Sequence, residues 1–133
     1  MTSYLLDTNA LLWVGLDDRQ LRPTARQQLF DAQLFTSVIS AAEISIKASI
    51  GKLPLPAPFD TDFGAALKTL LRRSDVELLP LEAPVIDHLR TLPLHHRDPF
   101  DRLIIAQALT RGLTLATRDR AFFAYDGLEI LEV

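Results

Sequence analysis

The sequence of 133 residues contains no cysteine. Disulfide bonds and thiolate metal sites are therefore excluded, and any bound metal has to be held by oxygen or imidazole ligands. Hard cations such as Mg²⁺ or Mn²⁺ are the ions that prefer carboxylate oxygens. The absence of cysteine thus directs the search for a metal site to the acidic residues.

The sequence also lacks an excess of basic residues and a long apolar run. The formal net charge of −3 argues against a generic polyanion binder, because nonspecific nucleic-acid affinity comes mainly from clustered lysine and arginine. No apolar run approaches the ~20 residues that span a bilayer, and the first residues do not resemble a signal peptide. We therefore expect a cytoplasmic protein without a membrane partner. Binding of a nucleic acid would require a local basic patch on its surface.

The composition is that of a folded globular chain. Hydrophobic residues make up 48% and charged residues 23% of the sequence, which argues against disorder. A chain of this length buries most of its unfolded surface around one core. We expect a single domain over residues 1–133.

Short apolar runs alternate with amphipathic segments along the chain. The expected strands are residues 4–6, 34–36, 76–79, 113–117 and 128–133. The expected helices are residues 10–14, 23–32, 40–50, 63–71, 84–92 and 98–112, with Asp60 as the cap of the helix over 63–71. Strands alternating with helices predict a three-layer α/β/α fold with a short, mostly parallel central sheet, whose strand order the spacing does not specify.

Four acidic residues, Asp7, Glu43, Asp101 and Asp119, lie in the first turn or cap of an expected helix. Each has a structural explanation, since the helix dipole and free N–H groups stabilise acids there, and Ser40 with Glu43 matches a capping box. In right-handed βαβ units, however, every crossover helix begins at the carboxyl edge of the sheet. The four acids can therefore share one rim, where their mutual repulsion requires protons or cations, and Mg²⁺ is the natural occupant.

A metal held at such a rim activates a water and stabilises the charge on a phosphodiester in an in-line displacement. The expected reaction is hydrolysis of a nucleic-acid backbone. Further candidates flank the acids. Arginines there could bind phosphate, although a solvated surface position is an equally good explanation for each of them. Other residues could support the acids or contact the substrate. These candidates are Arg97, Arg102, Arg118, Arg120, Lys47 (with an ion pair to Glu43 as the simpler role), Thr117 and Asp98 (chiefly as a helix cap).

Four segments, LLDTNALLW, SAAEISIK, HRDPFDRLIIAQA and TRDRAF, occur in this order over nearly the whole chain. Together they resemble the PIN-domain ribonucleases, and among these the VapC-type toxins of bacterial and archaeal toxin–antitoxin pairs. The resemblance implies a PIN-like fold in which Asp7, Glu43, Asp101 and Asp119 form the acidic quartet that holds one or two Mg²⁺ or Mn²⁺ ions, with Asp98 subsidiary. It further implies an endoribonuclease with an RNA substrate such as tRNA, rRNA or mRNA, a homodimer, and inhibition by a cognate antitoxin whose tail occupies the site.

Other functions remain compatible with the residues themselves. A metal-independent ribonuclease could use His95 and His96 as general acid and base, although adjacent histidines in a polar loop are more often simply exposed. A phosphatase with Asp7 as nucleophile lacks the second acid two residues on, where Asn9 stands. A metal-dependent DNA nuclease and a noncatalytic binding or receiver-like module, in which the acids serve as caps, complete the alternatives.

Overall fold

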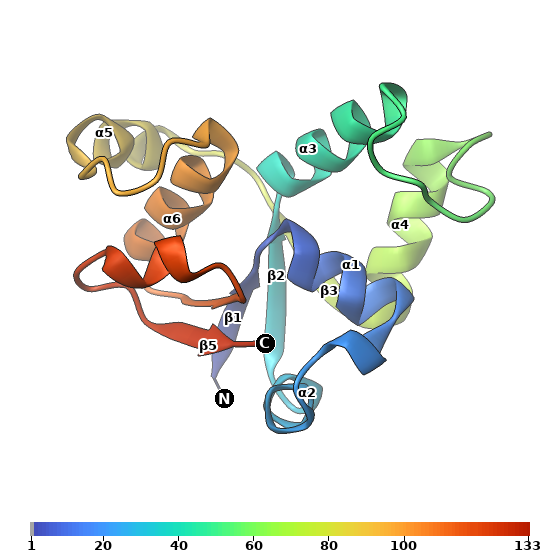
Figure 1. Cartoon of the computed structure of the whole chain (residues 1–133), viewed down its shortest axis with the longest axis horizontal. Coiled ribbons are helices and arrows are strands. Elements are labelled where there is room, and N and C mark those ends of the chain that lie inside the picture. The colour runs from blue at the N-terminus through green and yellow to red at the C-terminus, as the bar shows by residue number, and fades with distance from the viewer. Residues whose placement is uncertain (1) are drawn as a thin grey trace.

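A computed structural model describes residues 2–133 and contains one central sheet. Its strands are β1 (Ser3–Leu6), β2 (Gln33–Ser37), β3 (Val76–Leu79), β4 (Thr114–Thr117) and β5 (Ile130–Glu132). The strand order is β3-β2-β1-β4-β5, and every neighbouring pair is parallel. The prediction of a short, mostly parallel sheet is confirmed, and the first strand of the chain lies at its centre (Figure 1).

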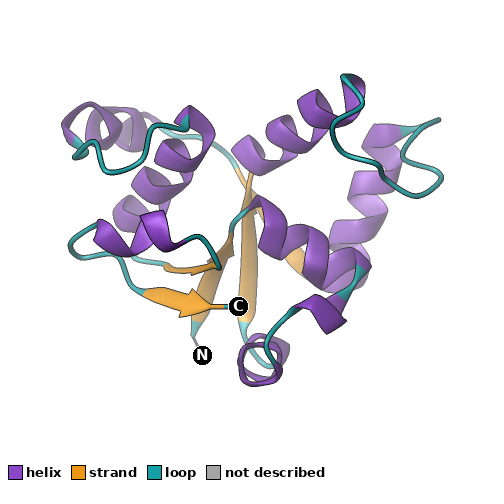
Figure 2. Cartoon of the chain, viewed as in Figure 1, coloured by secondary structure: helices purple, strands orange, loops and turns teal. Residues whose placement is uncertain are grey.

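Helices cover both faces of this sheet, which makes the fold a three-layer α/β/α structure as predicted (Figure 2). The layer of α1, α2 and α4 packs on one face, and α5 and α6 pack on the other, while α3 lies beside the carboxyl edge and contacts both α1 and α6. No helix within residues 2–133 is long and apolar enough to cross a membrane. The helices are α1 (Thr8–Leu16), α2 (Pro23–Phe30), α3 (Val38–Ser49), α4 (Phe63–Ser74), α5 (Ala83–Thr91) and α6 (Pro99–Arg111), with 3₁₀ turns η1 (Asp18–Gln20) and η2 (Arg120–Ala124).

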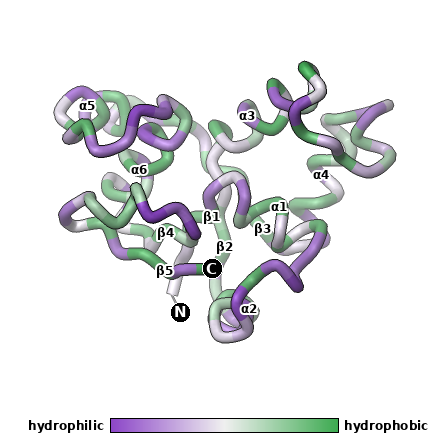
Figure 3. The backbone as a smooth tube through the Cα atoms, viewed as in Figure 1, coloured by the Kyte–Doolittle hydropathy of each residue, from purple (hydrophilic) through white to green (hydrophobic). Residues whose placement is uncertain are grey.

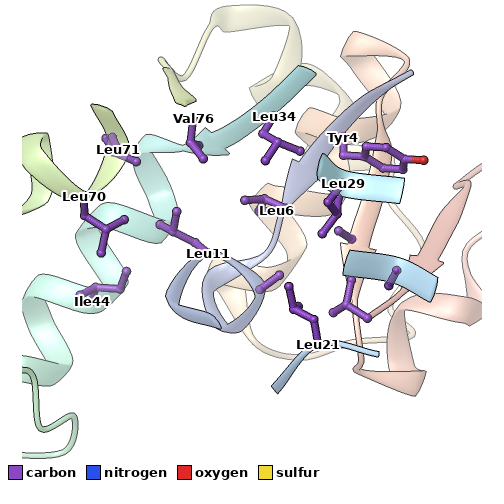
Figure 4. Close-up of a cluster of buried hydrophobic side chains, with 14 residues drawn as sticks. Tyr4, Leu6, Leu11, Leu21, Leu29, Leu34, Ile44, Leu70, Leu71 and Val76 are labelled. Carbon is purple, nitrogen blue, oxygen red and sulfur yellow. The ribbon is translucent and has the colours of Figure 1, made fainter. Parts of the chain in front are cut away.

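The core consists of two hydrophobic clusters, one on each face of the sheet. In β1 the side chains alternate between them: Tyr4 and Leu6 join the cluster under α1, α2 and α4, and Leu5 joins the cluster under α6 (Figure 4). A strand buried on both faces is apolar along its whole length, as central parallel strands are. Figure 3 shows this apolar interior, with hydrophilic stretches between α5 and α6 and directly after β4.

The apolar face of the α4 helix packs into the core. Leu70 and Leu71 belong to the first cluster, and Ala66 is buried as well. Its cap, however, is Asp62 and not Asp60, because Ala65 N–H donates to Asp62 Oδ1 at 3.1 Å. The predicted cap was therefore wrong by two residues.

Two other helix boundaries also differ from the prediction. The α3 helix begins at Val38, and its cap is Ser37, whose Oγ accepts from Ile39 N–H at 3.0 Å; the capping box of Ser40 and Glu43 is wrong, because both residues lie inside the helix. The α1 helix begins at Thr8, two residues before the predicted start at Ala10, and ends at Leu16, next to Gly15.

Gly15 has a packing role near the end of α1. A Cβ at this position would lie 2.6 Å from Leu70 Cδ2. A contact that short is sterically impossible without movement, so the missing side chain allows α1 and α4 to approach closely.

Candidate functional site

The carboxylate of Asp7 follows directly on the central strand β1. Asp7 is the N-cap of α1: its Oδ1 accepts from Ala10 N–H at 2.7 Å, and its Oδ2 accepts from the Thr117 hydroxyl at 2.5 Å. The residue is only 6% exposed. Burial raises the pKa of Asp7 to about 6 against the opposing effect of these two hydrogen bonds, and the negative charges of Asp119 and Glu43 raise it further.

Glu43 points toward Asp7 from the second turn of α3 and is equally buried. Its Oε1 accepts from the Thr8 hydroxyl at 2.6 Å, and its Oε2 accepts from Lys47 Nζ at 2.6 Å. The Thr8 hydroxyl, whose proton goes to Glu43, accepts from the Ser40 hydroxyl at 3.1 Å. Lys47 therefore makes the ion pair that was its simpler expected role, and this hydrogen bond raises the pKa of Lys47.

Asp98 and Asp101 come from the start of α6. Asp98 is the N-cap, as expected, and its Oδ1 accepts from the N–H groups of Phe100 at 2.9 Å and of Asp101 at 3.4 Å. Burial raises the pKa of Asp101 to about 7, and the neighbouring charge of Asp98 adds to that effect. Glu43 and Asp7 also raise this pKa, so the acids from three separate elements lie close enough to repel one another.

Asp119 lies between β4 and η2 and is joined to Asp101 by a histidine. Its Oδ1 accepts from Ala121 N–H at 2.9 Å and so caps the short helical turn that the sequence predicted. Its Oδ2 is hydrogen-bonded to His96 Nε2 at 3.1 Å, and the same nitrogen lies 3.0 Å from Asp101 Oδ2.

His96 is the residue that sequence reasoning missed. An exposed position was the expectation for both adjacent histidines, but the side chain of His96 is only 15% exposed, whereas His95 is exposed. His95 contacts the Tyr125 ring edge-on, with 5.0 Å between ring centroids. The sequence did contain one signal for this position of His96. His96 stands two residues before Asp98, the predicted cap, and so has to lie beside the start of α6.

The four arginines differ in position. Arg118 lines the site: its guanidinium carbon lies 4.2 Å from the centroid of the Trp13 ring, its Nε donates to Val133 O at 2.7 Å, and its Nη2 donates to Gln20 O. Arg120 instead pairs with Glu132 at 3.5 Å on the surface.

Arg102 does not face the site. Its guanidinium donates to the carbonyl oxygens of Leu92 at 3.2 Å, Pro93 at 3.0 Å and His96 at 3.3 Å, which saturates it with backbone contacts. Arg97 is exposed and also outside the cavity lining. Of the four arginines, Arg118 is the one that lines the cavity, and direct contact with phosphate stays a prediction.

The acids enclose a polar cavity of about 140 Å³ at the carboxyl edge of the sheet. Its lining comprises all four predicted acids together with their neighbours: Asp7, Thr8, Asn9, Trp13, Glu43, Lys47, Asp98, Asp101, Arg118, Asp119 and Phe122. A larger hollow of about 600 Å³ lies between the end of α3 and the proline-rich loop that follows, but its lining is mainly small and apolar. Only the smaller cavity, of the two, offers a set of charged ligands.

The donor set of this cavity fits a hard divalent cation. Carboxylate oxygens are the ligands that Mg²⁺ and Mn²⁺ prefer. Burial chiefly raises the pKa values of Asp7 and Asp101, and the neighbouring acids raise them further, so these residues belong to a cluster of negative charge that a cation relieves. His96, Asp101 and Asp119 each offer one ligand atom, and these three atoms lie within 4.8 Å of one another. Asp7, Glu43, Asp101 and Asp119 could therefore hold one or two such ions.

A three-layer fold whose parallel sheet carries an acidic cavity at its carboxyl edge places the protein among the α/β nuclease domains. The sequence model of the PIN domain matches residues 4–128, and the chain belongs to the PIN-domain family. PIN domains are generally nucleases that depend on divalent metal. No curated protein matches the sequence significantly.

Solved structures similar to this chain include toxin–antitoxin complexes. VapBC2 from Rickettsia felis, bound to a DNA fragment from its promoter, is 18% identical with a TM-score of 0.71 and covers 98% of each chain. DNA-bound VapBC from Salmonella typhimurium is 19% identical with a TM-score of 0.70 and the same coverage of 98% and 98%. VapBC-5 from Mycobacterium tuberculosis is 27% identical with a TM-score of 0.60 over 100% of both chains. The resemblance to VapC-type PIN domains seen in the four sequence segments is thereby confirmed.

Proposed function

We propose that this PIN domain is the toxin of a toxin–antitoxin pair, a metal-dependent endoribonuclease that hydrolyses RNA phosphodiester bonds. The observation that carries the proposal is the convergence of Asp7, Glu43, Asp101 and Asp119 around one polar cavity. The choice of a toxin over another nuclease draws support from the VapBC complexes among the similar structures. The choice of RNA rests on the resemblance of the four sequence segments to the PIN-domain ribonucleases.

Asp7, Glu43, Asp101 and Asp119 are the proposed ligands of Mg²⁺ or Mn²⁺. A bound ion supplies an activated water and offsets the charge that builds on the phosphodiester. Thr117 and the N–H of Ala10 orient both oxygens of Asp7. Such hydrogen bonds fix the direction in which a ligand presents its lone pairs.

Other side chains in the proposal hold the site or the substrate. Asp98 fixes the first turn of α6 and with it the backbone of Asp101, so its role is support and not ligation. Arg118 and Trp13 stand at the edge of the cavity, where a guanidinium attracts phosphate and an indole face stacks on a base. Lys47 pairs with Glu43 and so balances the negative charge of its carboxylate when no cation is bound.

RNA cleavage by purified full-length protein tests this function. Total cellular RNA is incubated with the wild type and Mg²⁺, with the wild type and a chelator, and with Asp7→Asn and Mg²⁺, and the new ends are mapped. We expect cleavage in the first reaction only. Asp31→Asn is the matched control, since Asp31 is exposed and outside the cavity.

The alternatives predict other results. Cleavage that survives the chelator indicates metal-independent chemistry, and full activity of Asp7→Asn contradicts a ligand role for that residue. Cleavage of DNA but not RNA supports the DNA nuclease. A noncatalytic binding module predicts that no nucleic acid is cut and that Asp7→Asn retains its biological effect.

An antitoxin partner and a homodimer complete the proposal. Overexpression of the chain is expected to arrest growth, and co-expression of a small protein encoded directly upstream is expected to reverse the arrest. The proposed homodimer would form a basic groove for RNA across the two chains, since one chain has a net charge of −3. Light scattering of the purified protein measures its mass in solution, and a monomeric mass contradicts this part.

A further inference from the structure

His96 lies between two acids that come from different parts of the fold. Its Nε2 is hydrogen-bonded to Asp119 Oδ2 at 3.1 Å and lies 3.0 Å from Asp101 Oδ2. Asp101 belongs to α6, and Asp119 follows β4. A single ring nitrogen therefore contacts two carboxylates that would otherwise repel each other.

The other ring nitrogen identifies the tautomer. The backbone N–H of Asp98 donates to His96 Nδ1 at 3.3 Å. A nitrogen that accepts a hydrogen bond carries no proton, so this contact places the ring proton on Nε2. The N–H group of the imidazole is therefore the end that faces Asp101 and Asp119.

Contacts with Tyr125, Arg102 and Phe122 fix the position of His96. The backbone N–H of His96 donates to Tyr125 Oη at 2.9 Å, and its carbonyl accepts from Arg102 Nη1 at 3.3 Å. The ring packs against Phe122, with 5.3 Å between the centroids. Arg102, whose other contacts hold the carbonyls of Leu92 and Pro93, thus fastens the connector that carries His96.

The geometry points to His96 as a positioning residue, whose Nε2–H holds the Asp101 and Asp119 carboxylates together and so forms half of the acidic cavity before a cation enters. The inference rests on the proposed function, because it concerns the same four acids. Its physical basis is that an N–H dipole between two carboxylates offsets their repulsion, and that ligands already in place lose less conformational freedom when an ion binds.

Mn²⁺ binding by the purified full chain tests this role, with free Mn²⁺ measured by electron paramagnetic resonance. His96→Leu removes the donor and retains the bulk of the side chain, whereas His96→Gln retains an N–H close to the position of Nε2. Loss of a hydrogen bond to a metal ligand commonly weakens metal binding about 10- to 100-fold, and we expect that loss for His96→Leu. His96→Gln is expected to bind within about threefold of the wild type, because the donor is restored.

His95→Leu is the matched control, since His95 is adjacent and exposed and packs on Tyr125 without contacting an acid in the cavity. It is expected to bind Mn²⁺ as the wild type does. The inference is overturned if His96→Leu binds as tightly as the wild type, or if His96→Gln binds as weakly as His96→Leu.

Two spectroscopic measurements on the wild type keep the inference testable even if His96→Leu does not fold. In the metal-free protein, ¹⁵N chemical shifts of the His96 ring are expected to show the Nε2–H tautomer, and an Nδ1–H tautomer overturns the inference. In the Mn²⁺-loaded protein, electron spin echo modulation is expected to show no directly bound imidazole nitrogen. Such a coupling would make His96 a ligand instead of a positioning residue and would also overturn the inference.

The same measurements separate this inference from the proposed function. If the wild type binds no Mn²⁺, both fail together. If it binds Mn²⁺ and cleaves RNA but His96→Leu binds the ion unchanged, only the positioning role fails. If it binds Mn²⁺ through a His96-dependent site but cleaves no RNA, the role of His96 stands and the ribonuclease proposal is wrong.

Discussion

The hydroxyl of Thr117 donates to Asp7 Oδ2 at 2.5 Å and joins residues that are 110 positions apart in the sequence. Thr117 ends β4 and Asp7 follows β1, so the bond links the carboxyl ends of two adjacent parallel strands. The same hydroxyl accepts from Asp119 N–H at 3.1 Å. One side chain thus orients two of the four proposed ligands.

Thr117→Val is expected to lower the free energy of unfolding by about 1–3 kcal/mol, because it removes a hydrogen bond to a buried carboxylate and leaves that oxygen without its donor. Urea denaturation measures the change. Thr110→Val is the control, since Thr110 is exposed near the end of α6 and its hydroxyl donates only to Ala106 O. The effect of this variant is expected to stay below about 0.5 kcal/mol. Equal losses in the two variants would contradict a special role for Thr117.

The stability of the metal-free protein is expected to fall as the pH rises from about 4 to 8. Burial raises the pKa of Asp7 to about 6 and that of Asp101 to about 7, both above the ordinary value of 3.8. Each group therefore binds its proton more tightly in the folded than in the unfolded state. The free energy of unfolding consequently falls as the pH rises from the pKa of the group in the unfolded state to its pKa in the folded state.

Asp7→Asn isolates this effect for one residue. Ionisation of Asp7 lowers the free energy of unfolding by up to about 3 kcal/mol as the pH rises, and the Asp7→Asn variant lacks this pH-dependent decrease. Denaturation in the presence of a chelator at pH 5 and at pH 8 measures the difference between wild type and variant. A difference that is the same at both pH values would contradict the raised pKa of Asp7.

Gly15→Ala is expected to destabilise the protein by about 1–3 kcal/mol, because the added Cβ would lie 2.6 Å from Leu70 Cδ2 and would force α1 and α4 apart. Gly64→Ala is the opposite case: nothing lies within 4 Å of its Cβ position in α4, and alanine favours the helix by up to about 1 kcal/mol. Thermal unfolding of the two variants should therefore show shifts of opposite sign. A stabilised Gly15→Ala would show that the two helices separate without cost.

Arg102→Ala is expected to lower both the free energy of unfolding, by about 1–3 kcal/mol, and the affinity for Mn²⁺, because the connector that carries His96 loses three carbonyl contacts. Denaturation and Mn²⁺ titration measure the two effects. A direct phosphate-binding role predicts the reverse pattern, with unchanged stability and a raised KM for RNA. Arg97→Ala, at an exposed position outside the cavity, is the control.

The sequence was sufficient to predict the layers of the fold and the shared rim of the four acids. Asp7 and Asp119 come soon after β1 and β4, and Glu43 lies in the helix that follows β2. The handedness of βαβ units brings the ends of parallel strands to one edge. The strand order and the contacts of Arg102 could not be predicted, because they depend on which distant segments meet. His96 was missed for the same reason: its partners Asp119, Phe122 and Tyr125 follow β4, and no local pattern links them to the connector before α6.

The central place of β1 between β2 and β4 has a consequence for the chain while it is being made. Thr117 and Asp119, which complete the surroundings of Asp7, are synthesised more than a hundred residues after it. A nascent chain therefore carries Asp7 without the rest of the acidic cavity until β4 and the turn after it have been made. The cavity can close around its four acids only after the strand that delivers Thr117 has joined the sheet beside β1.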